Sequence, residues 1–218
     1  QIKSSTSLSG TFTSENSEKL TNTAIENITT FQSTFIGLGF AYELPNNNNN
    51  NTVQNNSFSV DLRPSFGKRK NNDSSSNQIK LESNLSYLLE INQRSSFYFK
   101  NSIGVLNSDN YLENELFRIG SNKTVRGSQE QSLYVKEYLI QRIEYRYHTA
   151  NDAFLYSITD LAATATTRQN EKLLGLGVGY LFTSNNSQIN VSTAVGASQN
   201  SPINFKNTQF FVNWVNFF

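Results

Sequence analysis

Apolar and polar residues alternate along this chain with a period of two, over segments much longer than ordinary strands. Between Gln78 and Ile91 the odd positions are almost all apolar and the even positions are mostly polar or charged. The same alternation recurs at 57–67, 133–147 and 172–182. A β-strand with one apolar and one polar face has this period, because successive side chains point to opposite sides. The chain is therefore predicted to be all-β, with an antiparallel sheet.

Weaker alternation predicts six further strands, at about 5–13, 30–44, 95–106, 153–165, 187–198 and 206–218. The predicted total is therefore about ten strands. Several of the predicted strands run 11 to 15 residues, whereas strands of soluble domains have a mode of about 5–6. Strands that cross a membrane at a tilt need about 9–11 residues plus their extensions. Strand length therefore favours an antiparallel transmembrane β-barrel.

The predicted connections differ in length on the two sides of the sheet. Tight turns rich in Asn, Asp and Ser are predicted at 91–95, 148–153 and 184–187. They alternate with longer polar connections at 67–77, 106–132, 165–171 and 198–206. Outer-membrane barrels have short turns on the periplasmic side and long loops outside. This pattern predicts that the carboxyl end lies in the periplasm. It also predicts that the 106–132 loop lies outside the cell or folds into the barrel.

One connection breaks this rule. Pro45–Asn56, with its run of asparagines at Asn46–Asn51, falls on the side of the short turns. It is either a low-complexity insertion, or the strand count before it is wrong by one.

A soluble β-sandwich or lipocalin-like barrel is the alternative fold, with the apolar face inward and the charged face in water. Alternation alone does not distinguish the two arrangements, because it does not say which face meets solvent. Aromatic residues near strand ends match the interfacial girdle of a membrane barrel; they are Tyr42, Tyr145, Tyr147, Trp214 and Phe218. Together with strand length and turn asymmetry, they favour the membrane barrel.

Composition excludes several classes of function. The formal net charge of +1 gives no argument for a nucleic-acid partner, and the absence of Cys removes disulfides, thiol catalysis and thiolate metal sites. A single histidine, His148, makes a His-based metal cluster implausible. The longest apolar run, Leu173–Phe182, has about half the roughly 20 residues of a membrane helix. We therefore expect no cofactor, no metal and no membrane helix.

A polar, glycine-marked segment, FRIGSNKTVRG at Phe117–Gly127, precedes the last five predicted strands. It resembles the inward-folding loop of the Omp85 superfamily of outer-membrane barrels, which includes the BamA and TamA assembly factors and the patatin-linked barrels. The resemblance is closest to Bacteroidota-type members and is best from Leu116 to Phe218; before that it is architectural only. The glycine-rich LLGLGVGY and the terminal NWVNFF complete it. Where the family has an aromatic residue after Val-Arg-Gly, this chain has Ser128.

The resemblance implies a role for Val125, Arg126 and Gly127 as an anchor of the loop in the barrel lumen. In the family the loop arginine pairs with an aspartate, matched here by Asp160 in SITDLAA, and the strand after the loop carries a glutamate, matched by Glu144 in IEYRY. The pairing is physically reasonable, because a guanidinium is a fixed fork of donors that carboxylates can meet. The alternation places Glu144 on the charged face of its strand, whereas the strand of Asp160 has apolar residues on both faces. The simpler alternative is that Arg126 is a solvated loop residue.

The last predicted strand presents Phe210, Trp214 and Phe218 on one face, which would point to lipid. In the family a terminal Phe marks barrels for delivery to the assembly machinery, and the last strand meets the first at a weak seam. Unpaired backbone groups at such a seam can template an incoming strand by β-augmentation. The resemblance therefore implies insertion of other barrels without a nucleophile or metal.

We treat residues 1–218 as a single barrel domain. The family barrel has roughly 16 strands, about six more than are predicted here, and normally follows POTRA domains, whose β-α-α-β-β pattern is absent from this sequence. Three explanations compete: the C-terminal part of a longer chain, a short member with a smaller or dimeric barrel, or strands supplied by a partner. The absence of Met favours the first.

The expected function is therefore insertion, assembly or translocation of outer-membrane proteins by an integral protein of the bacterial outer membrane in a Gram-negative cell. Its expected partners are outer-membrane lipid and client barrels or subunits of an envelope complex, without nucleic acid. The second hypothesis is a passive or structural barrel in such a complex. An enzyme using Asp160, Glu144 and His148 as acid–base groups is the weakest, since no Ser-His-Asp or metal-binding spacing appears.

Overall fold

The computed structural model describes residues 3–18, 29–46, 56–71, 74–121, 123–129, 133–184 and 186–216. It is all-β, and the described residues contain no α-helix. Ten strands form one antiparallel sheet in chain order: β1 (Ser5–Ser17), β2 (Phe31–Pro45), β3 (Asn56–Asn71), β4 (Ser75–Asn92), β5 (Ser95–Ser108), β8 (Glu137–Ala150), β9 (Ala153–Ala165), β10 (Asn170–Ser184), β11 (Ser187–Ser198) and β12 (Gln209–Asn216). The predicted all-β class and the ten antiparallel strands are confirmed.

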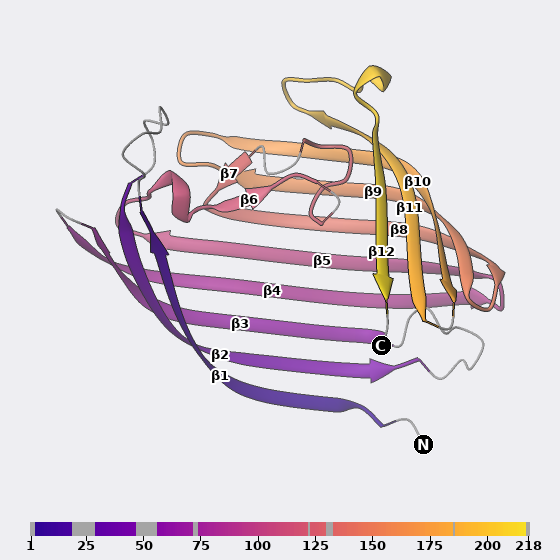
Figure 1. Ribbon diagram of the computed structural model, residues 1–218, viewed down its shortest axis with the longest axis horizontal. Coiled ribbons are helices and arrows are strands. Elements are labelled where there is room, and N and C mark those ends of the chain that lie inside the picture. Colours follow the sequence, from indigo (N-terminus) through magenta and orange to yellow (C-terminus); the bar gives the residue numbers. More distant parts are fainter. Residues whose placement is uncertain are drawn as a thin grey trace.

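The sheet is strongly curved, and the long connection between β5 and β8 lies within its concavity (Figure 1). This connection contains a one-turn 3-10 helix, η1 (Glu113–Glu115), and a small hairpin of β6 (Phe117–Ile119) and β7 (Leu133–Val135). A second 3-10 turn, η2 (Phe205–Asn207), precedes β12. In the described residues β1 and β12 are the two edges of the sheet and are not paired with each other.

The strand predicted at 133–147 is in fact two strands, which is a correction to the sequence interpretation. Leu133–Val135 leaves the sheet and pairs with Phe117–Ile119, and Val135 is completely buried there. Lys136 is the point of transition, because its backbone still bonds to both neighbouring strands at Leu106 and Ala165. The alternation continued through this point because the hairpin also has one buried face.

Two of the predicted long connections are short. β3 and β4 extend through most of 67–77. β9 is joined to β10 by residues 166–169, and this turn is closed by a hydrogen bond from the Thr166 amide to the Gln169 carbonyl. The polar residues of 67–77 had indicated a loop. In the structure β3 and β4 remain paired there, although the apolar alternation has ended. The predicted length asymmetry thus holds for 106–132 and 198–206. The predicted insertion after Pro45 falls mostly on residues 47–55, outside the described residues.

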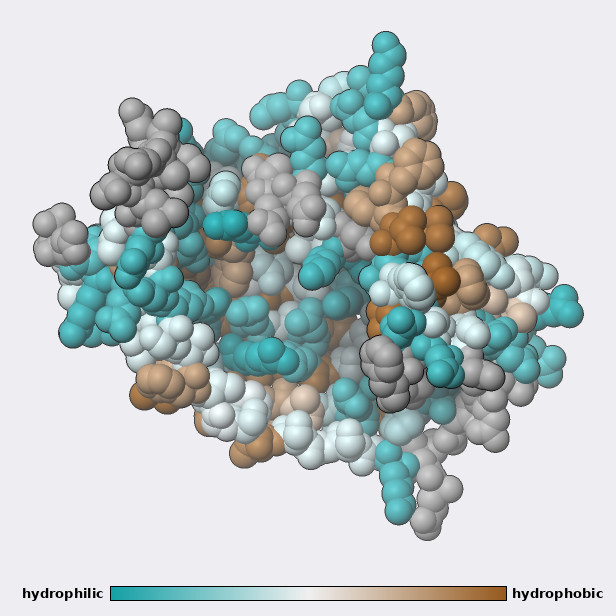
Figure 2. Space-filling model, in the orientation of Figure 1, coloured by the Kyte–Doolittle hydropathy of each residue, from teal (hydrophilic) through white to brown (hydrophobic). Residues whose placement is uncertain are grey.

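The two faces of the sheet differ in chemistry. The strand register is regular apart from shifts at Leu44/Pro45, Glu90/Asn92 and His148/Ala150. The outer face carries large hydrophobic side chains that are exposed on every strand except β5; examples are Phe12, Ile36, Phe66, Leu85, Leu139, Leu161, Val178, Val191 and Trp214. The inner face is polar, or is covered by the long connection. Figure 2 shows the hollowed inner side lined mainly by hydrophilic residues, with hydrophobic residues gathered toward the rim. The apolar face is therefore the uncovered one.

Candidate functional site: the anchored loop

The β5–β8 connection is held against the inner face of the sheet first by a small apolar cluster. Ile119, Val125 and Val135 from the connection pack on Ile140, Ala162 and Leu173 from β8, β9 and β10. The inner face of β9 is apolar at more than this point. Ala162 packs against the loop, whereas Phe154, Tyr156 and Ile158 belong to a second cluster, against which Phe211 of β12 packs. The strand of Asp160 therefore has apolar residues on both faces.

The tip of the connection is a tightly closed turn. The Ser121 amide donates to the Ser128 carbonyl at 3.2 Å, and Gly120 donates to the Thr124 hydroxyl at 2.8 Å. Gly120 and Gly127 have φ values of 119° and 85°, a backbone conformation that glycine adopts readily and that lets the chain turn at both ends of the tip. Ser121 also has a positive φ, 88°, a conformation that side chains other than glycine rarely adopt.

Arg126 projects from this turn into the sheet and binds Asp160 on β9 with three donors. Its backbone amide and Nε both donate to Asp160 Oδ2, at 2.9 and 2.8 Å, and Nη2 donates to Oδ1 at 2.6 Å. The remaining arm of the fork, Nη1, donates to Glu144 Oε1 on β8 at 2.6 Å. Arg126 is 3% exposed and Asp160 0%. The structure therefore brings together the three charged residues singled out from the sequence, and we call this set the Arg126 anchor.

A second arginine supports Glu144 from the other side. Arg146 donates to Glu144 Oε2 through Nε at 3.0 Å and Nη2 at 2.7 Å. Its guanidinium lies over the ring of Tyr98 at 4.0 Å and near that of Phe154 at 4.8 Å. Glu144 is thus oriented by Arg146, which is itself held between two aromatic rings.

Burial by itself lowers the pKa of the Arg126 guanidinium, but the hydrogen bonds and charges of Asp160 and Glu144 outweigh it and raise that pKa above its ordinary value. Arg126 is therefore a cation at neutral pH. A buried pair of this kind orients a segment more than it adds net stability, because both partners lose hydration. The Arg126 anchor fixes where the loop tip sits.

Glycines on the sheet make room for the loop backbone. This role was not predicted from the sequence. A Cβ at Gly175 of β10 would lie 2.1 Å from the Arg126 carbonyl oxygen, and one at Gly196 of β11 would lie 2.5 Å from that of Gly127. Gly175 is paired with Asp160 on one side and with Gly196 on the other. The loop thus lies directly on a row of residues without side chains. The available signal was the placement of the glycines of LLGLGVGY on the face opposite the apolar one.

A second buried ion pair, which was not predicted from the sequence, holds the start of the connection. Arg69 near the end of β3 donates to Glu115 Oε1 at 2.6 Å and to the Asn110 carbonyl at 3.3 Å; Gln78 of β4 donates to Glu115 Oε2 at 2.9 Å. Arg69 is 1% exposed. We call Arg69, Glu115 and Asn110 the Arg69 anchor. Its signal was weak, because Arg69 stands in the polar run KRK that resembled a solvated loop.

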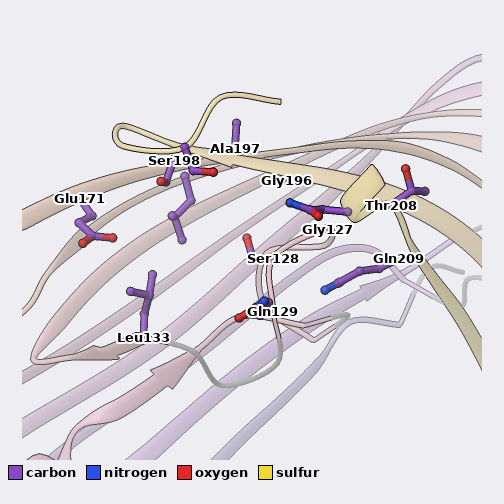
Figure 3. A pocket seen from close by; sticks show the side chains of 13 residues that line it. Gly127, Ser128, Gln129, Leu133, Glu171, Gly196, Ala197, Ser198, Thr208 and Gln209 are labelled. Atoms are coloured by element: carbon purple, nitrogen blue, oxygen red, sulfur yellow. The ribbon is translucent and has the colours of Figure 1, made fainter. Parts of the chain in front are cut away.

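Ser128, where the resemblance is weakest, borders a cavity of about 520 Å³ between the loop and the end of the sheet. The loop contributes Gly127, Ser128 and Gln129 to its wall, and β11 contributes Gly196, Ala197 and Ser198 (Figure 3). Glu171, Thr208 and Gln209 also line it. The small hydroxymethyl side chain of Ser128 leaves this space open on the loop side.

The C-terminal residues lie apart from the anchors. Phe210 and Trp214 are exposed on the outer face of β12, at 79% and 66%, as the alternation predicts. Phe211, on the inner face, packs against a cluster of Phe154, Tyr156, Ile158 and Ala194. Phe218 falls outside the described residues.

The side chains proposed for acid–base chemistry are not arranged as a catalytic set. Glu144 and Asp160 are both engaged by Arg126, and the His148 ring packs against that of Phe154, 5.4 Å between centroids. Among the described residues no group of three or more His, Asp or Glu could hold a metal ion. None of the helices in the described residues has the length and apolarity needed to cross a membrane.

Neither a protein-family model nor a curated protein matches this chain. The resemblance to the Omp85 superfamily therefore stays a prediction from the sequence.

Proposed function

We propose that this chain is an outer-membrane β-barrel of Omp85 type, integral to the outer membrane of a Gram-negative bacterium, which inserts, assembles or translocates other outer-membrane proteins. The observation that carries the membrane part is the exposed apolar face, which extends over the sheet. Soluble monomers rarely expose an apolar patch of more than about 300–600 Å². Lipid is the environment in which such a face is stable.

The inner face supports the same proposal. In a soluble sandwich the apolar faces would pack on each other and the charged faces would meet water. Here Arg69 and Asp160 are buried on the inner face, and Arg126 of the long connection is buried against Asp160. A polar interior with a loop folded into it is the arrangement of outer-membrane barrels with plugged lumens.

The Arg126 anchor supports the Omp85 assignment within this class. An arginine from a Val-Arg-Gly turn meets an aspartate and a glutamate on the two strands that follow the loop. The unpaired edges β1 and β12 leave three arrangements open: further strands in a longer chain, closure of a small or dimeric barrel, or strands from a partner. Any exposed edge offers unpaired backbone groups to an incoming client strand.

The membrane proposal can be tested at the outer face. Leu161, on β9, is 45% exposed. Leu161→Arg should destabilise a barrel in lipid by about 2–4 kcal/mol if the site lies near the bilayer midplane, measured by urea titration in vesicles. The matched control is Phe205→Arg in η2, which changes a 79% exposed aromatic residue outside the sheet. Equal tolerance of both changes would point to a water-exposed face and refute the membrane proposal.

The assembly function needs a separate measurement. The purified protein, reconstituted in liposomes, should accelerate the folding of an unfolded client barrel over empty liposomes, and depletion in cells should lower the levels of other outer-membrane barrels. A protein that inserts stably yet leaves client folding unchanged would instead be a passive or structural barrel of an envelope complex. The departure at Ser128 is the observation that favours this second function.

A further inference from the structure

A second, smaller cavity lies under the loop tip, on the side away from Ser128. Its volume is about 110 Å³, and it is lined by Asn84, Lys100, Ser102, Lys123, Thr124, Tyr138, Ile140 and Arg142. β4, β5 and β8 form its floor and the loop tip forms its wall. None of these lining residues is acidic.

Three cations converge on this cavity from two directions. Lys100 and Arg142 are direct cross-strand partners on the inner face of β5 and β8, and Lys123 reaches it from the loop. Like charges directly opposite on neighbouring strands destabilise a sheet. A negative charge placed between Lys100 and Arg142 would relieve this repulsion.

Of these three cations, Arg142 forms an ion pair with Asp160, whereas the described residues give no such partner to Lys100 or Lys123. Asp160 lies 3.5 Å from Arg142 Nε but is bound by three donors of Arg126, and Glu144 is held by Arg126 and Arg146. Glu82, on the inner face of β4, pairs with Lys80 at 3.5 Å. Across the described residues, Lys100 and Lys123 have no ion pair.

The resulting local charge is strongly positive, although the chain as a whole is close to neutral. The buried cluster and the cavity beside it contain five cationic side chains, from Arg126, Arg142, Arg146, Lys100 and Lys123, against the carboxylates of Glu144 and Asp160. An excess of this sign in a partly enclosed site attracts an anion.

The neutral lining groups also favour an anion. Ser102 donates to Asn84 Oδ1 at 2.7 Å, and the side-chain amide of Asn84 also carries two N–H donors. Arg142 Nη2 donates to the Thr124 carbonyl at 3.3 Å, which links the cavity wall to its floor. Tyr138 adds a hydroxyl that can donate.

We propose that this cavity binds a small oxyanion of phosphate size, held by Lys100, Lys123 and Arg142. Its volume of about 110 Å³ has room for one such anion. The bound anion neutralises the Lys100–Arg142 repulsion and attaches the loop, through Lys123, to β5 and β8. This site is separate from the assembly function proposed above and from the carboxylates of the Arg126 anchor.

The test is titration of the full chain with inorganic phosphate in neutral-lipid nanodiscs, followed by calorimetry and by mass spectrometry of lysine acetylation. Phosphate should bind more tightly than chloride and should protect Lys100 and Lys123 from acetylation. The double variant Lys100→Gln with Lys123→Gln should weaken binding at least tenfold. Nanodiscs containing phosphatidic acid without free phosphate form a second arm; protection only there would assign the phosphoryl group to a lipid headgroup.

The matched control is Lys68→Gln with Lys206→Gln, which removes the same charge from two exposed lysines. It should leave phosphate binding unchanged. Thermal unfolding gives a second measurement that does not depend on affinity. Without phosphate, Lys100→Gln should raise the Tm, because the repulsion between Lys100 and Arg142 is relieved. Phosphate should raise the Tm of the natural protein and leave that of Lys100→Gln unchanged. Equal binding by both double variants, or equal protection by chloride, would overturn the proposal.

Discussion

The Arg126 anchor holds the tip of the long connection and the Arg69 anchor holds its start, and the two exchange the roles of loop and sheet. In the first, the loop supplies the arginine and strands β8 and β9 supply the carboxylates. In the second, β3 supplies the arginine and the loop supplies Glu115. Each contains an arginine–carboxylate contact of 2.6 Å, and both arginines are almost completely buried.

The two anchors differ in how completely the arginine is satisfied. Arg126 uses Nε, Nη1, Nη2 and its backbone amide, and meets two carboxylates. Arg69 meets one carboxylate, and its buried Nε has no hydrogen-bond partner among the described residues. A satisfied fork specifies a single geometry, whereas a partly satisfied one tolerates adjustment. The comparison indicates that the loop tip is the more rigidly placed end.

The largest effect is expected from Arg126→Ala, which leaves Glu144 and Asp160 buried without their shared cation. Removing one partner of a buried pair costs about 3–5 kcal/mol. The loop tip should therefore open locally while the sheet stays folded. Trypsin cleavage after Lys123 should accelerate on the order of a hundredfold or more, because local proteolysis follows the open population, whereas Glu-specific cleavage after Glu113 should change little.

Two further variants separate charge from geometry at this anchor. Arg118→Ala, an exposed arginine on β6 of the same loop, is the control and should not accelerate cleavage. Arg126→Lys keeps the charge but loses the fork, so it should give an intermediate effect. Arg126→Asp combined with Asp160→Arg should partly restore protection. Unchanged cleavage in Arg126→Ala would show that the anchor does not hold the loop.

Arg69→Ala should have a smaller effect, confined to the other end of the connection. It removes a charged hydrogen-bond partner of Glu115 and Asn110, at about 1.5–3 kcal/mol. Cleavage after Glu113 should accelerate about tenfold or more, and cleavage after Lys123 should not. Equal acceleration at both sites would mean that the connection opens as one unit, and the distinction between the anchors would fail.

A purely steric change should weaken the Arg126 anchor without altering any charge. Gly175→Ala would place a Cβ 2.1 Å from the Arg126 carbonyl oxygen, so the loop backbone must shift, at about 1–3 kcal/mol. The measurement is again cleavage after Lys123. The control is Gly10→Ala on β1, where an added Cβ meets nothing within 4 Å. Equal behaviour of the two glycine variants would argue against close contact between loop and β10.

The smallest effect concerns Asn114, which donates to the Ser17 hydroxyl at 2.7 Å and to the Thr29 carbonyl at 2.9 Å. Asn114→Ala removes two neutral hydrogen bonds, each contributing about 0.5–1.5 kcal/mol. Combined with Arg69→Ala, it should accelerate cleavage after Glu113 slightly more than Arg69→Ala alone. Cleavage after Lys123 should stay unchanged. Protection after Glu113 as strong as in the natural protein would show that β1 does not support this end.

The residues of the Arg126 anchor could be predicted because they belong to a recognisable motif with carboxylates on the next two strands. The Arg69 anchor could not. Arg69 and Glu115 are 46 residues apart, each stands among polar neighbours, and nothing local distinguishes a buried arginine from a solvated one. The division of the strand at 133–147 was also hidden, since a hairpin over the sheet and a strand within it have the same alternation.

The sequence by itself determined the all-β class, the ten long strands and which residues share a face, because side-chain direction in a strand depends only on position parity. Only the tertiary structure decided which face is covered. That choice depends on where the 106–132 connection lies, and therefore on contacts between residues distant in the chain. The same contacts bury Arg69 and Arg126, bring Gly175 and Gly196 under the loop backbone, and gather Lys100, Lys123 and Arg142 around one cavity.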